Sequence, residues 1–243
     1  MPLINETDLW SLAKRALAPA DRPAEHNPPQ WPPAQDTSRI SRSVPLHDVL
    51  TARRSVRRFR EDPVPDTDLA TLLDLATSTD RQMWPHGTAA TTPQAWLVSG
   101  VAGTSGARLR QYVPRRSPAG AATAVEPLAG EFTDHGDCPE PALLAARYAP
   151  APVTVLICAE ITDDTGTAAD DTGSDYGRAL LRASAFGYNA WLSAVAAGLG
   201  GSVHGRSSPE VTRIVRRHTG TPARHLFTLV LGHPAESPQE FGP

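Results

Sequence analysis

The densest group of residues able to do chemistry is the segment Ala52–Phe59, whose sequence is ARRSVRRF. It holds four arginines and one serine in eight residues. Guanidinium groups bind phosphate or carboxylate oxygens through paired N–H donors, and a serine hydroxyl adds a neutral donor. If the segment is extended, Ser55 and Arg57 lie on one face and Val56 on the other. The segment is therefore either a seat for an anionic ligand or a solvated, ion-paired surface.

The composition of the whole chain does not explain this local charge. The 243 residues carry a formal net charge of −3, so we expect neither a nucleic-acid partner nor an acidic membrane surface. The first residues lack a basic stretch followed by an apolar run, and no apolar run approaches about 18 residues. Cys138 and Cys158 have no metal or redox spacing. We expect a reduced cytoplasmic protein without a membrane span.

Other common chemistries find little support in the sequence. The eight histidines have no metal-ligand spacing, so we expect no metal site, and no Gly-x-Ser-x-Gly follows a predicted strand. The glycine cluster GLGGSVHG (198–205) does not match a dinucleotide fingerprint, because Val203 occupies the third glycine position and the cluster follows a helix. We expect these glycines to stop that helix and to bring backbone N–H groups close to a flat ligand.

The chain divides into a proline-rich N-terminal arm, residues 1–44, and a globular domain, residues 45–243. The arm is either a disordered leader or an extended segment that wraps a partner subunit. Within the domain, Asp66 is the expected N-cap of a helix with apolar residues at i, i+3, i+4 and i+7. Residues 101–141 are rich in Gly, Pro and Arg and indicate an inserted loop or hairpin.

Apolar patterns predict the remaining elements and an α/β or α+β class. Continuous apolar, β-branched runs are typical of strands buried on both faces. The predicted strands are 95–100, 152–160 and 225–234, and the predicted helices are 46–53, 66–80, 176–200 and 208–220. In the last helix Ser208 is the expected N-cap and Gly220 the residue just past the end.

Three of these stretches, taken in order, resemble the FMN-dependent nitroreductase superfamily. RRSVRRF followed by LATLLDLA is similar to the opening segment of that family, which holds the flavin phosphate and ribityl chain. TAATTPQAW (88–96) resembles a family segment that ends in Asn-x-Gln-Pro-Trp, although Thr92 and Ala95 replace its Asn and Pro. Residues 189–215 resemble the central helix, its glycine stop, the flavin-facing turn and the next helix. The resemblance covers roughly residues 45–235.

The resemblance implies an α+β, nitroreductase-like three-layer fold with a central mixed, mainly antiparallel sheet flanked by helices. It also implies bound FMN and a homodimer whose flavin sites are shared between subunits. The long helix supports a dimer independently, since one helix can bury so apolar a surface only in a core or against a partner. The expected FMN-binding residues are Arg53, Arg54, Ser55, Arg57, Thr92, Pro93, Gln94, Gly201, Ser202, His204 and Gly205.

The middle of the chain resembles the azoline-oxidase branch of the superfamily, which tailors ribosomal peptides. That branch uses a Lys–Tyr pair as acid and base, and here Tyr148 follows Arg147 instead. Because arginine cannot act as a base near neutral pH, the candidate catalytic residues are His204, Tyr148 and Tyr188. An imidazolium at His204 would also stabilise a reduced flavin anion.

The function implied is oxidation, by hydride transfer to FMN, of a peptide or other natural-product intermediate, with a biosynthetic partner enzyme. A generic NAD(P)H-dependent nitro- or quinone reductase is the alternative enzyme. A catalytically lapsed, flavin-binding scaffold subunit is a further alternative, because Lys14 is the only lysine and lies in the N-terminal arm.

Overall fold

The computed structural model describes residues 44–85, 92–100, 106–114, 130–138, 140–161 and 172–235, with side chains in the last range from 176. The predicted N-terminal arm therefore lies outside the described residues, apart from Val44. In chain order the elements are α2 (Leu46–Ala52), α3 (Asp66–Met83), β1 (Gln94–Ser99), β2 (Arg108–Val113), β3 (Glu131–Asp137), α4 (Pro141–Arg147), β4 (Val153–Ala159), α5 (Thr172–Ala196), β5 (Gly200–His204), α6 (Pro209–Thr219) and β6 (Arg224–Gly232).

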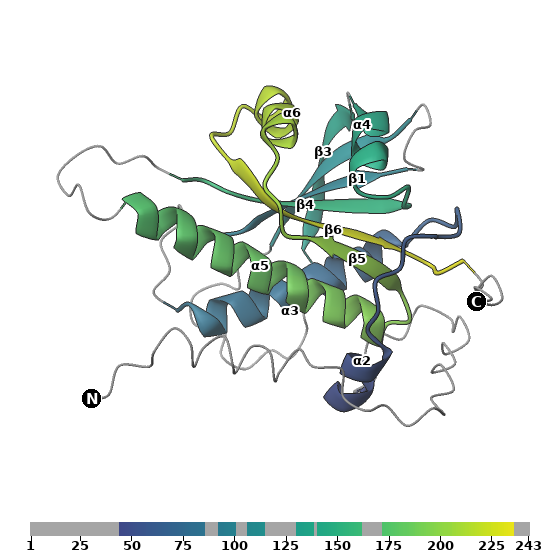
Figure 1. The fold of residues 1–243 in the computed structure, drawn as a ribbon. Helices are drawn as coiled ribbons and strands as arrows, with labels where there is room; N and C mark the ends of the chain where they lie inside the picture. Colours follow the sequence, from purple (N-terminus) through teal and green to yellow (C-terminus); the bar gives the residue numbers. More distant parts are fainter. Residues whose placement is uncertain are drawn as a thin grey trace, which may run out of the picture. The chain divides into compact units, whose positions relative to one another are not determined.

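One six-stranded sheet organises these elements, in the order β3-β2-β1-β4-β6-β5 (Figure 1). Every pairing between the named strands is antiparallel, and a parallel bridge between Ser55 and Gly201 lies outside them, in keeping with the expected mainly antiparallel sheet. β4 is buried at all seven positions, as its continuous apolar sequence predicts for a strand covered on both faces. β3 and β5 form the two edges of the sheet.

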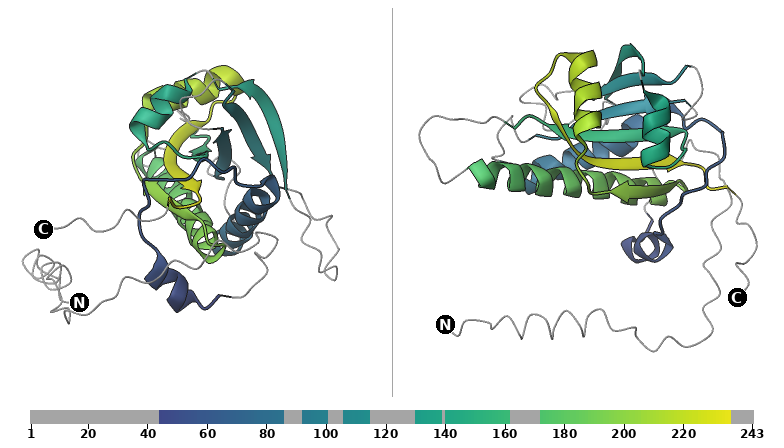
Figure 2. Two further views of the ribbon diagram at one scale, coloured as in Figure 1. Left: turned by 90° about the vertical axis from the view of Figure 1, so that its right-hand side faces the viewer. Right: turned by 45° about the horizontal axis from the view of Figure 1, so that its top comes forward.

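Helices cover both faces of the sheet, which confirms the predicted three-layer α+β fold. Figure 2 shows α3 and α5 along one face and α4 and α6 on the other. Under α3 and α5 the core includes Trp191, Phe186 and alternate residues of β4 such as Val155. Under α4 and α6 it includes Trp96 and the intervening residues of β4 such as Leu156. The two-residue alternation of the strands thus divides the apolar side chains between two cores.

The helix α5 runs for 25 residues and packs against α3 and β5. Specific contacts hold it near its middle and at its C-terminal end. Near its middle, Arg182 makes two hydrogen bonds of 2.7 and 2.6 Å to the Asp80 carboxylate of α3, and both side chains are buried. At its end, Gly198 adopts a φ of +81°, and the Leu199 N–H donates to the Ala194 carbonyl at 2.9 Å. Glycine adopts this left-handed conformation without a steric penalty, so it ends the helix as predicted.

Both ends of α6 also follow the sequence prediction. Ser208 is the N-cap and accepts a hydrogen bond from the Val211 N–H, while Gly220 lies just past the helix with a φ of +67°. At α3 the prediction is wrong, because Pro65 precedes the helix and Asp66 is its first residue. The Asp66 carboxylate instead accepts a hydrogen bond of 2.6 Å from Arg110 on β2.

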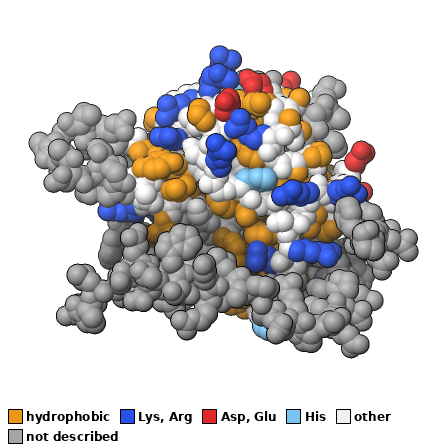
Figure 3. Space-filling view, in the orientation of Figure 1, with side chains coloured by type: hydrophobic (Ala, Val, Ile, Leu, Met, Phe, Trp, Pro, Cys, Tyr) orange, Lys and Arg blue, Asp and Glu red, His pale blue; other side chains and the backbone are white. Residues whose placement is uncertain are grey.

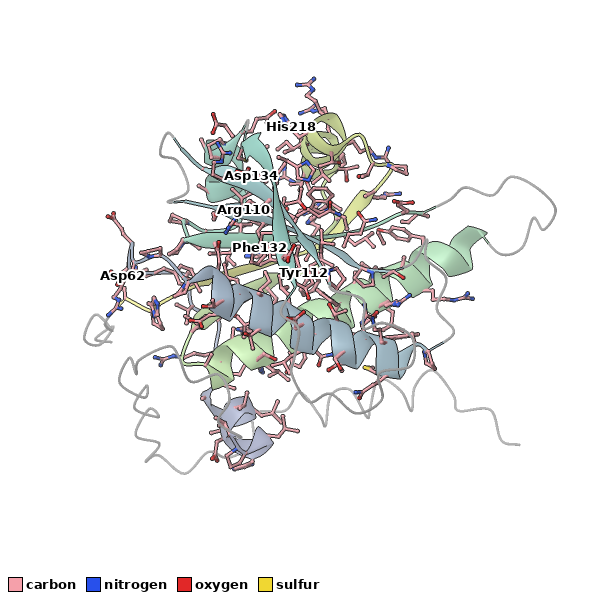
Figure 4. The ribbon with its side chains drawn as sticks, turned by 180° about the vertical axis from the view of Figure 1, so that it is seen from behind. Asp62, Arg110, Tyr112, Phe132, Asp134 and His218 are labelled. Carbon is pink, nitrogen blue, oxygen red and sulfur yellow. The ribbon has the colours of Figure 1, made fainter. Side chains whose placement is uncertain are left out.

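The region expected to be an inserted loop or hairpin contains β2 and β3, and α4 begins where it ends. The two strands pair antiparallel at the sheet edge. Because both carry many polar, exposed side chains, their sequences lack the apolar pattern that predicts a buried strand. Arg108 pairs with Asp134 and Asp137, and the Tyr112 hydroxyl donates to Asp74 of α3. Figure 4 shows Tyr112 and Phe132 on the sheet side of α3. The seven-residue helix α4 was not predicted from the sequence.

Candidate functional site

The arginine-rich segment Ala52–Phe59, called the arginine segment below, lies along the outer edge of β5. The Val56 N–H donates to the Gly201 carbonyl at 2.9 Å, and Ser55 forms a parallel bridge with Gly201. Farther along, the Arg60 N–H donates to the His233 carbonyl at 2.9 Å. Side chains alternate along the segment as predicted, with Ser55 exposed and Val56 partly buried. Two predicted ligand-binding stretches that are distant in the sequence are therefore neighbours in space.

Glycines in β5 make this close approach possible. A Cβ at Gly201 would lie 2.9 Å from the Trp191 ring, and one at Gly200 would lie 3.0 Å from the Val56 side chain. Both glycines are therefore required by packing, and the expected flavin-facing turn is a strand over most of its length. Gly205 is different, because a Cβ there would meet nothing nearer than 3.8 Å. Its missing side chain leaves the backbone open to a ligand.

The cations of the segment have different surroundings. The Arg53 guanidinium lies 4.9 Å from the Trp191 ring centre and 5.7 Å from that of Tyr188, within the range of cation–π attraction. Its Nε atom is buried and makes no hydrogen bond to a described residue. Arg54 and Arg57 are exposed. The segment thus offers the oriented guanidinium of Arg53, whose Nε atom has no hydrogen bond to a described residue, and the exposed guanidinium of Arg57.

Two candidate catalytic residues meet on the face of the sheet that carries α4 and α6. The rings of His204 and Tyr148 lie 5.1 Å apart. Burial, and then the positive charge of Arg57, lower the pKa of His204, although a hydrogen bond with the Tyr148 backbone opposes the shift. His204 is therefore mainly neutral at neutral pH in the protein as described.

The hydroxyl of Tyr148 is the more buried of the two groups. Only 7% of Tyr148 is exposed, and its hydroxyl makes no hydrogen bond within the described part of the chain. The Thr228 hydroxyl lies nearby but is engaged with His225 at 2.7 Å. Burial raises the pKa of Tyr148, opposed by Thr228 and Arg147. Tyr148 is therefore a protonated hydrogen-bond donor at neutral pH.

A polar network that the sequence did not reveal supports this pair. Buried His225 accepts a hydrogen bond at Nδ1 from the Ser208 N–H at 3.1 Å, so its Nε2 carries the proton shared with Thr228. Arg147 donates to the Ser208 hydroxyl, which donates to Glu210, both at 2.8 Å. These residues come from α4, α6 and β6. The one sequence signal for this network was His225, a histidine at the start of an apolar strand.

The structure separates the stretch Thr92, Pro93 and Gln94 from the arginine segment within one chain. Gln94 begins β1 and donates to Glu160 at 3.1 Å, while its Oε1 atom is buried without a hydrogen bond to a described residue. β4 and β6 lie between β1 and β5. Three steps of about 4.8 Å make a separation of roughly 14 Å. One chain therefore holds the predicted cofactor ligands in two separate groups.

Tyr188 is distant from the His204 and Tyr148 pair, whereas Ser202 lies two residues before His204 on the same strand. Tyr188 lies on α5, on the other face of the sheet, with its ring 5.9 Å from that of Trp191. Ser202 is only 3% exposed and pairs with β6. Among the described residues, no group of three or more His, Cys, Asp or Glu side chains could hold a metal ion. Nor does that part of the chain include a helix long and apolar enough to cross a bilayer.

Solved structures share this arrangement of sheet and helices, and the fold is that of the nitroreductases. A putative nitroreductase from Ralstonia eutropha aligns with a TM-score of 0.53 and 18% identity, over 81% of this chain and 86% of that one. NfrA2 of B. megaterium gives 0.51 and 15%, over 82% and 70%. A putative nitroreductase from Anabaena variabilis gives 0.52 and 16%, over 78% and 38%. At these identities the likeness shows the fold alone.

The sequence itself gives the family. Residues 50–233 match the nitroreductase family, so the chain belongs to that family. Its members are oxidoreductases that typically depend on FMN. No curated protein sequence matches the chain.

The residues along β5 fit such a cofactor. Arg53, Ser55 and Arg57 are donors of the kind that bind phosphate oxygens, and Arg53 keeps a buried donor without a partner among the described residues. Gly205 leaves room for a flat ligand against the backbone. The chemistry of this donor set therefore agrees with FMN.

The buried network predicts a specific dependence of stability on pH. Burial lowers the pKa of His225 from 6.5 to about 4, so between these values the unfolded chain binds the extra proton. The free energy of unfolding should fall as pH is lowered through this window, by at most about 3 kcal/mol in total. Urea unfolding of the wild type and of His225→Gln, measured between about pH 6.5 and 5, should show a smaller pH slope in the variant. His47→Gln on α2 is the control, and equal slopes in all three proteins would contradict the assignment.

Proposed function

We propose that the protein is an FMN-dependent oxidoreductase that oxidises a small-molecule or peptide intermediate in natural-product biosynthesis. One observation carries the proposal: the arginine segment lies hydrogen-bonded along β5, the strand that ends at His204. When bound, FMN supplies a ring that accepts or donates hydride. Arg53, Ser55 and Arg57 would hold its phosphate and ribityl chain, and the backbone near Gly205 would contact its ring.

His204 and Tyr148 are the residues that would manage the proton of the reaction. The lowered pKa of His204 favours a neutral imidazole, which can accept a proton. The raised pKa of Tyr148 favours a hydroxyl that donates. The Arg147 guanidinium, held by Ser208 and Glu210, fixes the end of α4 where Tyr148 lies. Tyr188 lies on the other face of the sheet and would take no part in this pair.

Bound FMN is the first expectation, and Arg57 is the residue that tests it. We expect Arg57→Gln to weaken FMN binding by about 1.5–3 kcal/mol, the scale of a hydrogen bond to a charged group. Affinity can be measured by the quenching of FMN fluorescence on titration with apoprotein. Arg58→Gln is the matched control, because its exposed side chain alternates to the other face of the segment. Equal FMN affinity in both variants and the wild type would make the segment an ordinary solvated surface.

The electron donor separates the proposed tailoring enzyme from a generic reductase. Under anaerobic conditions NADH or NADPH is mixed with the FMN-loaded protein, and loss of the flavin absorbance is followed. A tailoring dehydrogenase should be reduced by its own organic substrate and only slowly by either nucleotide. Rapid reduction by NADPH or NADH, followed by reoxidation with a quinone, would favour the generic nitro- or quinone reductase. A protein that binds FMN but exchanges electrons with no donor would support the scaffold alternative.

We further propose a homodimer in which each flavin site takes residues from both chains. The outward positions of α5 with more than a third of their surface exposed include Leu181, at 64%, and Tyr188, at 37%. Arg178 is the one charged residue among the exposed positions of α5 described between 176 and 196. A helix face this poor in charge suits a partner helix rather than water. A second copy would also supply the stretch Thr92–Gln94 that one chain holds at a distance.

Charge placed on this helix face should dissociate the dimer. We expect Leu181→Glu to shift the protein from dimer to monomer in sedimentation velocity and to lower FMN affinity, because half of each site is lost. Arg213→Glu, on the exposed side of α6, should leave both properties unchanged. If Leu181→Glu stays dimeric, or if the wild type is a monomer that retains FMN, the proposed interface is wrong.

A further inference from the structure

A pocket opens beyond the end of β5, between α4 and the start of α6. Its volume is about 450 Å³, a size suited to a small organic molecule. The lining residues are Arg147, Tyr148, His204, Arg206, Ser207, Pro209 and Glu210. All of them belong to two short stretches around α4 and the segment between β5 and α6. The pocket therefore adjoins the pair of residues to which the proposed function assigns the proton.

The charges that line this pocket do not balance. Arg147 is neutralised by Glu210, at 3.3 Å, and the same guanidinium donates to the Ser208 hydroxyl. Arg206 is exposed and has no ion pair with any described residue. Arg57 adds positive charge at the His204 side. Figure 3 shows basic side chains spread over one face of the molecule, with acidic ones toward its upper and right-hand edges. The pocket therefore has a net positive charge.

Two polar groups of the lining residues also lack partners. The Nε2 atom of His204 and the hydroxyl of Tyr148 are buried, and neither makes a hydrogen bond within the described residues. Buried polar atoms are normally satisfied, and each one left without a partner costs about 1–3 kcal/mol. A ligand hydroxyl or N–H group in this pocket would recover part of that cost by donating to His204 Nε2, which is an acceptor in the neutral ring because the other ring nitrogen donates to the Tyr148 backbone. The two aromatic rings, 5.1 Å apart, supply the apolar part of the wall.

The geometry points to a substrate subsite for a carboxylate, in which Arg206 binds the carboxylate group and His204 and Tyr148 contact the body of the molecule. The subsite deepens the proposed function, on which it rests for the identity of the reaction. It names the substrate class as small organic acids or peptides with a free carboxylate. Arg206 is the residue that sets this specificity, because Arg147 is already paired.

The test compares two probes that differ in charge but hardly in shape, benzoate and benzamide. Binding of each to the FMN-loaded protein is measured by isothermal titration calorimetry at fixed ionic strength. The wild type should bind benzoate about tenfold more tightly than benzamide, and Arg206→Gln should abolish that preference by weakening benzoate alone. Arg206→Lys should keep part of it. Arg217→Gln, in the last turn of α6, is the control and should bind both probes as the wild type does.

Three outcomes would overturn the subsite: no measurable benzoate binding, equal affinity of the wild type for both probes, or an unchanged preference in Arg206→Gln. FMN affinity is measured for every variant in parallel, since the flavin phosphate is also an anion. If Arg206→Gln loses FMN while the preference for benzoate persists, Arg206 serves the cofactor and the subsite is wrong. The binding assay needs no turnover, and it is repeated on protein without FMN. A protein that binds no FMN would therefore refute the proposed function while the benzoate measurement still decides the subsite.

Discussion

The candidate site depends on the close contact between β5 and its two neighbours, the arginine segment and α5. Gly200 and Gly201 allow it, because a side chain at either position would collide with Val56 or Trp191. The contact lets the Val56 N–H reach the Gly201 carbonyl and holds the Arg53 guanidinium over the Trp191 ring. Without it, the edge strand would have an unpaired backbone and the arginines would have no fixed position.

The alternation of side chains along β5 then gives the site two sides. Val203 packs toward α5 and its core, whereas His204 meets Tyr148 under α4. A cation-rich side and the side proposed to manage the proton thus share one short strand. Arg57 links them electrostatically, since its charge adds to burial in lowering the pKa of His204. Hydrogen bonds of buried His225 with Ser208 and Thr228 hold the His204 side of the site in place. Because burial lowers the pKa of His225 to about 4, this network does not titrate near neutral pH.

The distance between the stretch Thr92–Gln94 and β5 is a second constraint on function. Both stretches match parts of the nitroreductase family in sequence, yet two strands lie between them. The buried Asp80–Arg182 pair and the packing of α3 on α5 make a rearrangement within one chain costly. In the proposed homodimer a second copy would bring the two stretches together, and the nearly uncharged outer face of α5 is the surface proposed to form it.

The sequence by itself determined the family, the layers and most of the elements. Continuous apolar runs identified β4 and β6, the 3.6-residue period identified α3, and Ser208 and Gly220 marked the ends of α6, because these signals depend on local backbone chemistry. It placed β2 and β3 only as a loop or hairpin, because their polar faces carry cross-strand ion pairs, and it misread the strand β5 as a turn. Only the tertiary structure decided that Arg57 lies near His204, that Tyr188 lies on the other face, and that Arg147, Ser208 and His225 form one network. These contacts join residues far apart in the chain, and no local pattern records which side chains the packing of sheet and helices brings together.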